Sequence, residues 1–190
     1  MLLIAHRGSM TRGLQNSPEG IHLASRQGVD GVELDVTCGR DGRFRCVHGL
    51  GRGTALEDCL AAMDGIHRLI IHLKGFFSSL DLSKLAGLLA DQIPHTKIVF
   101  AAHRGEVLRR LRTVVTDACL ARFGVFPALL ALWRQPVWQI ALVNQIVLWP
   151  GFVRALQARG FIVYASCVWE VRSRTAVSRL GVDGAFVNLR

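Results

Sequence analysis

The chain has 190 residues, 51% of them hydrophobic and 19% charged, a balance that excludes a disordered protein and allows one domain with a full core. The formal net charge is +9, and most of the cationic residues are arginines. No helix-turn-helix, zinc-finger or aromatic RNA-binding pattern accompanies them, so a nucleic-acid partner is not expected.

Short apolar runs alternate with segments of helical spacing along the whole chain. The apolar runs predict strands at 2–5, 31–36, 44–48, 69–73, 97–101, 119–124, 161–165 and 184–187. The intervening segments predict helices at 18–27, 55–63, 82–92, 106–115, 151–159 and 171–180. Strands that alternate with helices indicate a parallel sheet, and eight such strands predict a compact (β/α)8 TIM-type barrel formed by a single domain, 1–190.

The first predicted strand and the cysteines indicate the cellular compartment in which the protein is expected. The run 2–5 is too short for the apolar region of a signal peptide, and no basic segment precedes it. The five cysteines are scattered without C-x-x-C spacing, which favours reduced thiols over a disulfide framework or a zinc site. We therefore expect a cytoplasmic protein.

The segment 123–153 is unusually apolar, with Arg134 as its only charged residue. Prolines and polar residues interrupt it, so it contains no run of ~18 apolar residues that would span a membrane. We expect a buried strand and helix here. A lipid-facing patch near the active site remains the alternative, with peripheral membrane contact as its consequence.

Two carboxylates lie in the second predicted strand. Glu33 and Asp35 are two residues apart between apolar neighbours, so their side chains share one face of the strand. Two carboxylates on a buried face repel each other unless a cation lies between them. Mg²⁺ or Ca²⁺ is the expected occupant of such an oxygen-rich site.

Histidines end the first and third predicted strands, at His6 and His48. Active sites of barrels collect at the C-terminal ends of the strands, so both imidazoles are expected to face the carboxylates. On the fourth predicted strand His72 and Lys74 share one face and are expected to have acidic partners. Carboxylates for a metal beside near-neutral proton donors are what cleavage of a phosphodiester requires.

The sequence resembles the glycerophosphodiester phosphodiesterases of the phospholipase-C-like barrel superfamily. The resemblance rests on His6-Arg7-Gly8, the loop Asn16-Ser17-Pro18-Glu19, Glu33-x-Asp35, and the histidine that ends the third strand. It implies roles for seven side chains: His6 and His48 as the general acid/base pair, Arg7 and Lys74 as ligands of the substrate phosphate, and Glu33, Asp35 and His72 as metal ligands.

This sequence departs from the family pattern at several places. His72 stands where a third carboxylate is usual, and because imidazole favours softer ions, Mn²⁺ or Zn²⁺ become alternatives to Mg²⁺ or Ca²⁺. Gly49 replaces an aspartate, and the short connection after His48 leaves no room for the usual cap insertion. Asn188 replaces another aspartate. A second His-Arg-Gly, at 103–105, is interpreted as a chance echo that could still add a cation to the barrel mouth.

The resemblance implies metal-dependent hydrolysis of small glycerophosphodiesters to glycerol phosphate and an alcohol. Because the third metal carboxylate is replaced by His72, two alternatives stay open. One is a catalytically silent barrel that binds a phosphate headgroup. The other is a membrane-surface phospholipase of the same superfamily, which would use the basic surface and the apolar segment 123–153.

Overall fold

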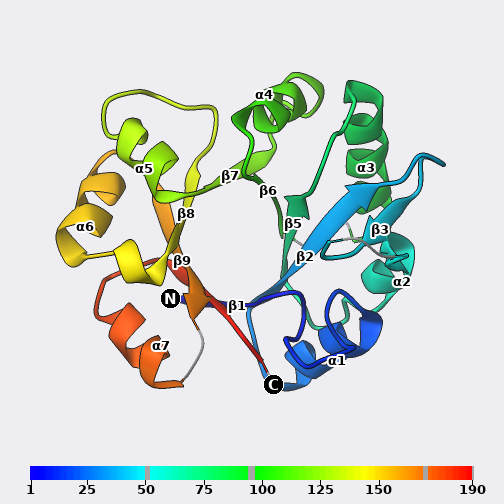
Figure 1. Ribbon diagram of the computed structural model, residues 1–190, viewed down its shortest axis with the longest axis horizontal. Helices are drawn as coiled ribbons and strands as arrows, with labels where there is room; N and C mark the ends of the chain where they lie inside the picture. Colours follow the sequence, from blue (N-terminus) through cyan, green and yellow to red (C-terminus); the bar gives the residue numbers. More distant parts are fainter. Residues whose placement is uncertain (50–51, 94–96, 169–170, 190) are drawn as a thin grey trace.

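The structure is a computed structural model, which describes residues 1–49, 52–93, 97–168 and 171–189. Eight parallel strands pair side by side until β1 meets both β10 and β2, which closes the sheet into a barrel (Figure 1). In order around the barrel the strands are β1 (Leu2–Ala5), β2 (Gly31–Cys38), β5 (Arg68–Leu73), β6 (Lys97–Ala102), β7 (Cys119–Phe123), β8 (Ile140–Asn144), β9 (Ile162–Val168) and β10 (Gly184–Val187). The predicted (β/α)8 barrel is confirmed.

Helices surround the barrel and cover the outer face of the sheet (Figure 1). They are α1 (Pro18–Arg26), α2 (Leu56–Ala61), α3 (Ser79–Gln92), α4 (Gly105–Val114), α5 (Val125–Ala131), α6 (Pro150–Ala158) and α7 (Val171–Ser178), with a 3-10 turn η1 (Gln145–Val147). Helix α1 begins with Pro18 at its first position, and the Ser17 hydroxyl accepts a hydrogen bond from Gly20 N at 3.2 Å. None of the helices described is both long and apolar enough to cross a bilayer.

The predicted barrel strand at 44–48 is wrong. Strand β3 (Phe44–Cys46) pairs antiparallel with β2, and β4 (Thr54–Ala55) pairs with β3, so both extend the sheet beyond the barrel. A tight turn with Gly42 at φ +74° joins β2 to β3. Only an antiparallel partner can follow so short a turn, because a parallel strand needs a crossover of about a dozen residues or more.

The barrel strand that the sequence left unassigned is β8, inside the apolar segment 123–153. Its residues 140–143 are buried, so the expected buried strand is present. The helix that precedes it, α5, buries only Ala128 and Ala131 and exposes Phe126 and Leu130, so the expectation of a buried helix is wrong there. A continuous apolar run has no alternation of exposed and buried positions, which is why its strand boundaries could not be read from the sequence.

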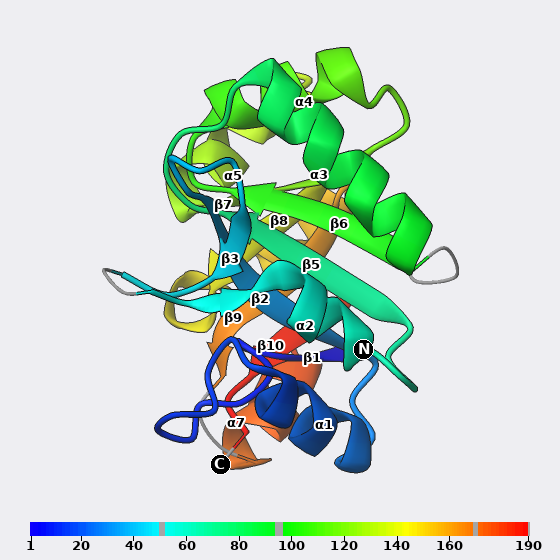
Figure 2. The ribbon, with the colours of Figure 1, turned by 90° about the vertical axis from the view of Figure 1, so that its right-hand side faces the viewer.

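The barrel interior is filled at the end where the strands begin. Tyr164 is fully buried there, and its hydroxyl accepts a hydrogen bond of 2.7 Å from Arg68 Nη1. Only glycine fits beside that ring, because a Cβ at Gly184 would lie 2.8 Å from it. In the side view of Figure 2, the N-terminus lies at this end, while the loop after β1 and the β3–β4 extension lie at the other. That other end, the mouth, is where a site can open.

Candidate active site at the barrel mouth

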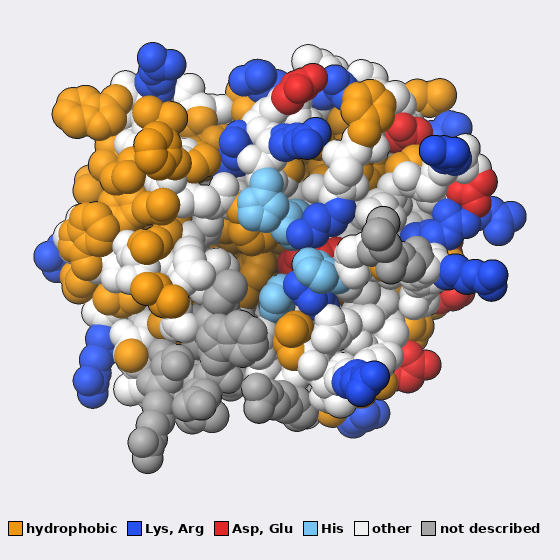
Figure 3. Space-filling model, viewed as in Figure 1, with side chains coloured by type: hydrophobic (Ala, Val, Ile, Leu, Met, Phe, Trp, Pro, Cys, Tyr) orange, Lys and Arg blue, Asp and Glu red, His pale blue; other side chains and the backbone are white. Residues whose placement is uncertain are grey.

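A cavity of about 550 Å³ opens at the mouth, where imidazole, cationic and acidic side chains gather at the centre of the face in Figure 3. All seven predicted site residues line it: His6 and Arg7 after β1, Glu33 and Asp35 on β2, His48 after β3, and His72 and Lys74 at the end of β5. Four segments of the sequence therefore meet in one cavity. The roles of these residues stay predictions.

Glu33, Asp35 and His72 form a buried cluster on the cavity floor. Each carboxylate is 1% exposed, and one ligand atom from each of the three residues lies within 4.8 Å of the others. Alternation along β2 turns both carboxylates inward, and the register of β2 with β5 pairs Asp35 with His72. Spacing, burial and donor type suit one divalent cation held by two carboxylates and an imidazole.

Asp35 is surrounded by cationic or proton-donating groups. Its Oδ1 lies 3.2 Å from His72 Nδ1 and 3.1 Å from Lys74 Nζ. Its Oδ2 lies 2.9 Å from His48 Nδ1 and 3.0 Å from Arg7 Nε, the latter an ion pair without hydrogen-bond alignment. Burial opposes ionisation of Asp35, but the hydrogen bond from His72 and the charge of Lys74 hold its pKa well below the usual range. Asp35 is therefore a carboxylate at any physiological pH.

His72 lies between the two carboxylates, with Nδ1 3.3 Å from Glu33 Oε1 and 3.2 Å from Asp35 Oδ1. Burial favours the neutral ring, yet the hydrogen bonds to Asp35 and Glu33 leave its pKa raised overall. Its ring stacks on Phe123 at 4.2 Å, and within the described part of the chain its buried Nε2 has no hydrogen-bond partner. Nδ1 is thus the nitrogen directed at the two carboxylates.

His6 is held in one tautomer. Its Nδ1 lies 2.9 Å from Asn188 Oδ1, an acceptor, so Nδ1 carries the proton and donates it. Nε2 lies 4.0 Å from Glu33 Oε2 and is the nitrogen that carries the lone pair in the neutral ring. Asn188 thereby orients the imidazole in the way that a carboxylate or amide orients a catalytic histidine.

His48 reaches the cavity from outside the barrel, and its side chain is 49% exposed. The argument from barrel strand ends therefore gave the right cavity for the wrong reason, because β3 is not a barrel strand. Its Nδ1 contacts Asp35 Oδ2 at 2.9 Å, and its Nε2 lies 3.2 Å from Arg7 Nη2. An arginine donates only, so His48 is the neutral ring with its proton on Nδ1.

The loop after β1 is tightly constrained. Arg7 and Asn16 both have φ +55°, a left-handed conformation that costs energy for residues with a side chain. The backbone N of Arg7 donates to Glu33 Oε2 at 3.0 Å, and Asn16 Oδ1 accepts from Asp35 N at 2.9 Å. Strain in this loop is thus offset by hydrogen bonds that tie it to the Glu33 carboxylate and to the backbone of Asp35.

Three residues of the site had little or no weight in the sequence analysis: His103 and Phe123, which line the cavity, and Asn188, which contacts His6. The ring of His103 lies 5.1 Å from His72 and 4.8 Å from Phe123. Burial, and then the charges of His72 and Lys74, lower the pKa of His103, so it adds a neutral ring to the mouth and not a cation. Its signal in the sequence was the second His-Arg-Gly at a strand end.

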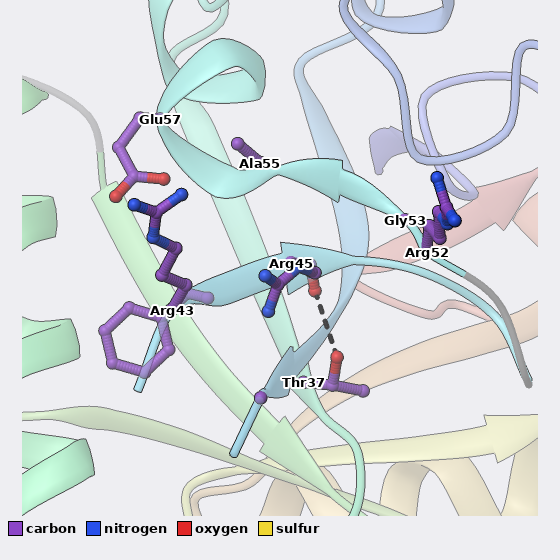
Figure 4. Close-up of a pocket in the computed structure, with 9 residues that line it drawn as sticks. Thr37, Arg43, Arg45, Arg52, Gly53, Ala55 and Glu57 are labelled. Atoms are coloured by element: carbon purple, nitrogen blue, oxygen red, sulfur yellow. Dashed lines mark hydrogen bonds between the residues drawn. The ribbon is translucent and has the colours of Figure 1, made fainter. Parts of the chain in front are cut away.

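A larger hollow, about 970 Å³, lies apart from these residues, along the β3–β4 extension. Figure 4 shows the arginines Arg43, Arg45 and Arg52 around it, with the Thr37 hydroxyl hydrogen-bonded to the backbone of Arg45. Arg45 forms an ion pair with Asp41. None of the predicted site residues is among the residues that line this hollow.

A closed parallel barrel whose mouth combines buried carboxylates, imidazoles and cationic side chains has the architecture of the barrel phosphodiesterases. The family model described as "Glycerophosphoryl diester phosphodiesterase family" matches residues 6–100, which is half of the chain. The chain belongs to this family.

Solved structures share the whole fold. A phosphodiesterase of Oleispira antarctica, in complex with the product sn-glycerol-3-phosphate, is 17% identical, with a TM-score of 0.85 over 98% of this chain and 92% of that one. A glycerophosphodiester phosphodiesterase of Parabacteroides distasonis is 19% identical, with a TM-score of 0.81 over 98% and 92% of the two chains. Identities this low establish a shared fold alone.

A curated relative matches over a short segment. The Mycobacterium tuberculosis protein named "Probable glycerophosphodiester phosphodiesterase 1" is 41% identical over 46 residues, 24% of this chain. The match spans 17% of that protein's length. Its activity is therefore no more than a guide to the activity of this chain.

Proposed function

We propose that the chain hydrolyses glycerophosphodiesters to glycerol phosphate and an alcohol. The observation that carries the proposal is the convergence of the seven predicted residues on one cavity around the buried carboxylates Glu33 and Asp35. Membership of the family supports it, as does the product bound to the Oleispira antarctica relative.

Glu33, Asp35 and His72 through Nδ1 would hold a divalent metal. Such an ion supplies charge to polarise a phosphoryl oxygen and to stabilise the negative charge of the transition state. The two carboxylates suit Mg²⁺ or Ca²⁺, and the imidazole admits Mn²⁺ or Zn²⁺. With the ion bound, the proton on His72 Nδ1 that faces both carboxylates must leave.

Two side chains would position the phosphate. The guanidinium of Arg7 and the ammonium of Lys74 line the cavity, with their side chains 14% and 27% exposed. A phosphate there would take hydrogen bonds from Arg7 that now go to Gln15 Oε1 and His48 Nε2. The incoming substrate therefore frees His48 Nε2 from its cationic neighbour.

Proton transfer would fall to His6 and His48. Hydrolysis forms a bond from a water oxygen to phosphorus and breaks the bond from phosphorus to the alcohol oxygen, so one proton leaves the water and one reaches the alcohol. His6 Nε2, the nitrogen that carries the lone pair, can accept a proton because Asn188 holds the other proton on Nδ1. His48, with Nδ1 on the Asp35 carboxylate, can hold a proton on Nε2 once Arg7 has moved to the phosphate.

The test is turnover of glycerophosphocholine and glycerophosphoethanolamine by the purified protein, with Mg²⁺, Ca²⁺, Mn²⁺ or Zn²⁺, and with glycerol phosphate as the measured product. We expect activity with at least one ion and a loss of about 10²–10⁴-fold in His6→Ala. No product with any ion would overturn the proposal. So would an unchanged rate in His6→Ala, which removes the side chain that Asn188 orients.

A second candidate, a silent barrel that binds a phosphate headgroup, is favoured by the contacts of Asp35. Arg7, His48, His72 and Lys74 already surround this carboxylate, so a metal must compete with them. Calorimetry with each metal and with glycerol phosphate separates the two candidates. Binding of glycerol phosphate without any binding of metal or turnover would favour the silent barrel.

A further inference from the structure

An exposed apolar surface borders the cavity on the side of α5 and η1. Its members are Phe126, Leu130, Ile146, Val147 and Trp149, which we call the apolar rim. Phe126 is 74% exposed, Ile146 84% and Trp149 53%, values far above those of core residues. Such a contiguous patch is typical of a surface that contacts a partner or a membrane.

The rim lies at the mouth end of the barrel. Helix α5 starts directly after β7, and η1 and Trp149 follow β8, so all three come just after the C-terminal ends of strands. Figure 3, which looks onto the mouth, shows hydrophobic side chains gathered on the side of the face where Figure 1 places α5 and α6. The rim and the cavity therefore face the same way.

The rim continues into the cavity. Ile146 and Val147 are exposed at the surface and also line the cavity, where Val125, Leu142 and Phe123 extend the same apolar wall. The carboxylates and cations lie on the cavity's other side. A ligand with a phosphodiester and a hydrocarbon chain would match this division, because the charged group would meet the cations while the chain stayed on the wall and the rim.

Charge indicates which occupant the rim suits. Between Asp117 and Glu170 the sequence has no acidic residue, and the rim lies within this stretch. Of the arginines there, Arg134 follows α5 and Arg154 lies on α6, beside the rim. A second copy bound through the same patch would bring two acid-free, arginine-bearing surfaces together, which charge repulsion opposes. An anionic lipid surface attracts the arginines and takes up the exposed aromatic and aliphatic side chains.

We propose that the apolar rim docks on an anionic lipid surface, and that the mouth cavity takes a glycerophosphodiester carrying an acyl chain. The docking stands on the rim alone. The assignment of an acylated substrate rests on the proposed function, because it specifies the class of glycerophosphodiester that the same site would hydrolyse. The same hydrolysis applies, with water added across the bond from phosphorus to the alcohol.

Vesicle flotation tests the docking without any need for turnover. The probes are vesicles of phosphatidylcholine and of phosphatidylcholine with phosphatidylglycerol. We expect the protein to float with the anionic vesicles at low salt. We expect the affinity of the double variant Phe126→Gln/Ile146→Thr for these vesicles to be about tenfold lower. Ile162→Thr is the matched control, because Ile162 is 38% exposed at the opposite end of the barrel, where β9 begins.

Several results would overturn the docking: no flotation of the wild type at low salt, equal binding by the double variant, or equal loss in Ile162→Thr. A dimer in sedimentation velocity that the double variant abolishes would assign the rim to a second copy instead. Each of these measurements is independent of activity.

Turnover tests the substrate class. We expect a lower KM for lysophosphatidylcholine than for glycerophosphocholine. Phe126→Gln, which removes a rim side chain outside the cavity, should raise the KM for lysophosphatidylcholine and leave the KM for glycerophosphocholine unchanged. Equal kcat/KM for both diesters would overturn the acyl-chain assignment. If neither diester turns over while the vesicles still bind, the proposed function fails and the docking stands.

Discussion

The two sides of the mouth cavity differ in chemistry and in how they were built. One side, from β1, β2, β5 and the loop after β3, carries the carboxylates, imidazoles and cations, and lies inside the stretch 6–100 that matches the family. The other side, from β7, β8 and η1, is mostly apolar and lies outside it. The charged and imidazole side chains are concentrated in the part of the chain that matches the family model, whereas the apolar wall that faces them lies outside that match.

Under the proposed function, one barrel would carry out the reaction on one side of the cavity and hold the rest of the substrate on the other. Phosphate and metal chemistry needs fixed residue types, because only carboxylate, imidazole and cationic groups supply it. An apolar wall needs only hydrophobic side chains of suitable volume, which many sequences provide. The predictions below alter one side of the cavity at a time, from the largest expected effect to the smallest.

Removing the charge of Asp35 should have the largest effect. In Asp35→Asn, four cationic or proton-donating neighbours lose their carboxylate partner, so we expect metal binding to vanish in calorimetry, and the free energy of unfolding to fall by about 3 kcal/mol. Asp41→Asn is the matched control, because Asp41 pairs with Arg45 on the exposed β2–β3 turn. Metal binding retained in Asp35→Asn would place the ion elsewhere.

Restoring the family's carboxylate should strengthen the polar side. In His72→Glu, three carboxylates surround one point, so we expect affinity for Mg²⁺ or Ca²⁺ to rise about tenfold and the preference for Zn²⁺ to fall. Calorimetry with each ion measures this. His22→Glu makes the same exchange on the exposed face of α1 and should change no metal affinity. Weaker Mg²⁺ binding in His72→Glu would show that the imidazole suits the ion better.

Altering the apolar side should affect the polar side through one contact. Phe123 stacks on His72 at 4.2 Å, so in Phe123→Leu the imidazole loses the surface that fixes its ring plane. We expect metal affinity to fall by a few-fold, an effect smaller than that of losing a ligand. Phe76→Leu, at a phenylalanine that is 73% exposed, is the control. Unchanged affinity would mean that the two sides of the cavity act independently.

The stability of the metal-free protein should depend on His72. Its pKa in the folded state is raised above the usual 6.5, so its contribution to stability is fully present below about pH 6.5 and is lost as pH rises through the higher folded value. We expect the free energy of unfolding in chelator to decline across that window and His72→Gln to flatten the decline. Asp35 titrates far lower, because its pKa is depressed, and does not contribute there. Equal slopes in wild type and His72→Gln would contradict this.

Much of the site was predictable, because strand alternation fixes side-chain direction locally. Glu33 and Asp35 share a face by their spacing alone, and so do His72 and Lys74. His103 carried the same kind of signal and received less weight than its position in the cavity deserves. Asn188 had none beyond a departure from the family pattern, because its partner His6 is 182 residues away.

By itself, the sequence determined the alternation of strands and helices, the inward faces of the charged strands and the family to which the chain belongs. Tertiary structure decided which strands are neighbours. A turn too short for a parallel crossover turned β3 outward, yet still brought His48 onto Asp35, and the apolar segment 123–153 supplied β8 to the barrel and the rim to its mouth. Periodicity acts within a strand, whereas closure of a barrel depends on contacts between residues far apart in the chain.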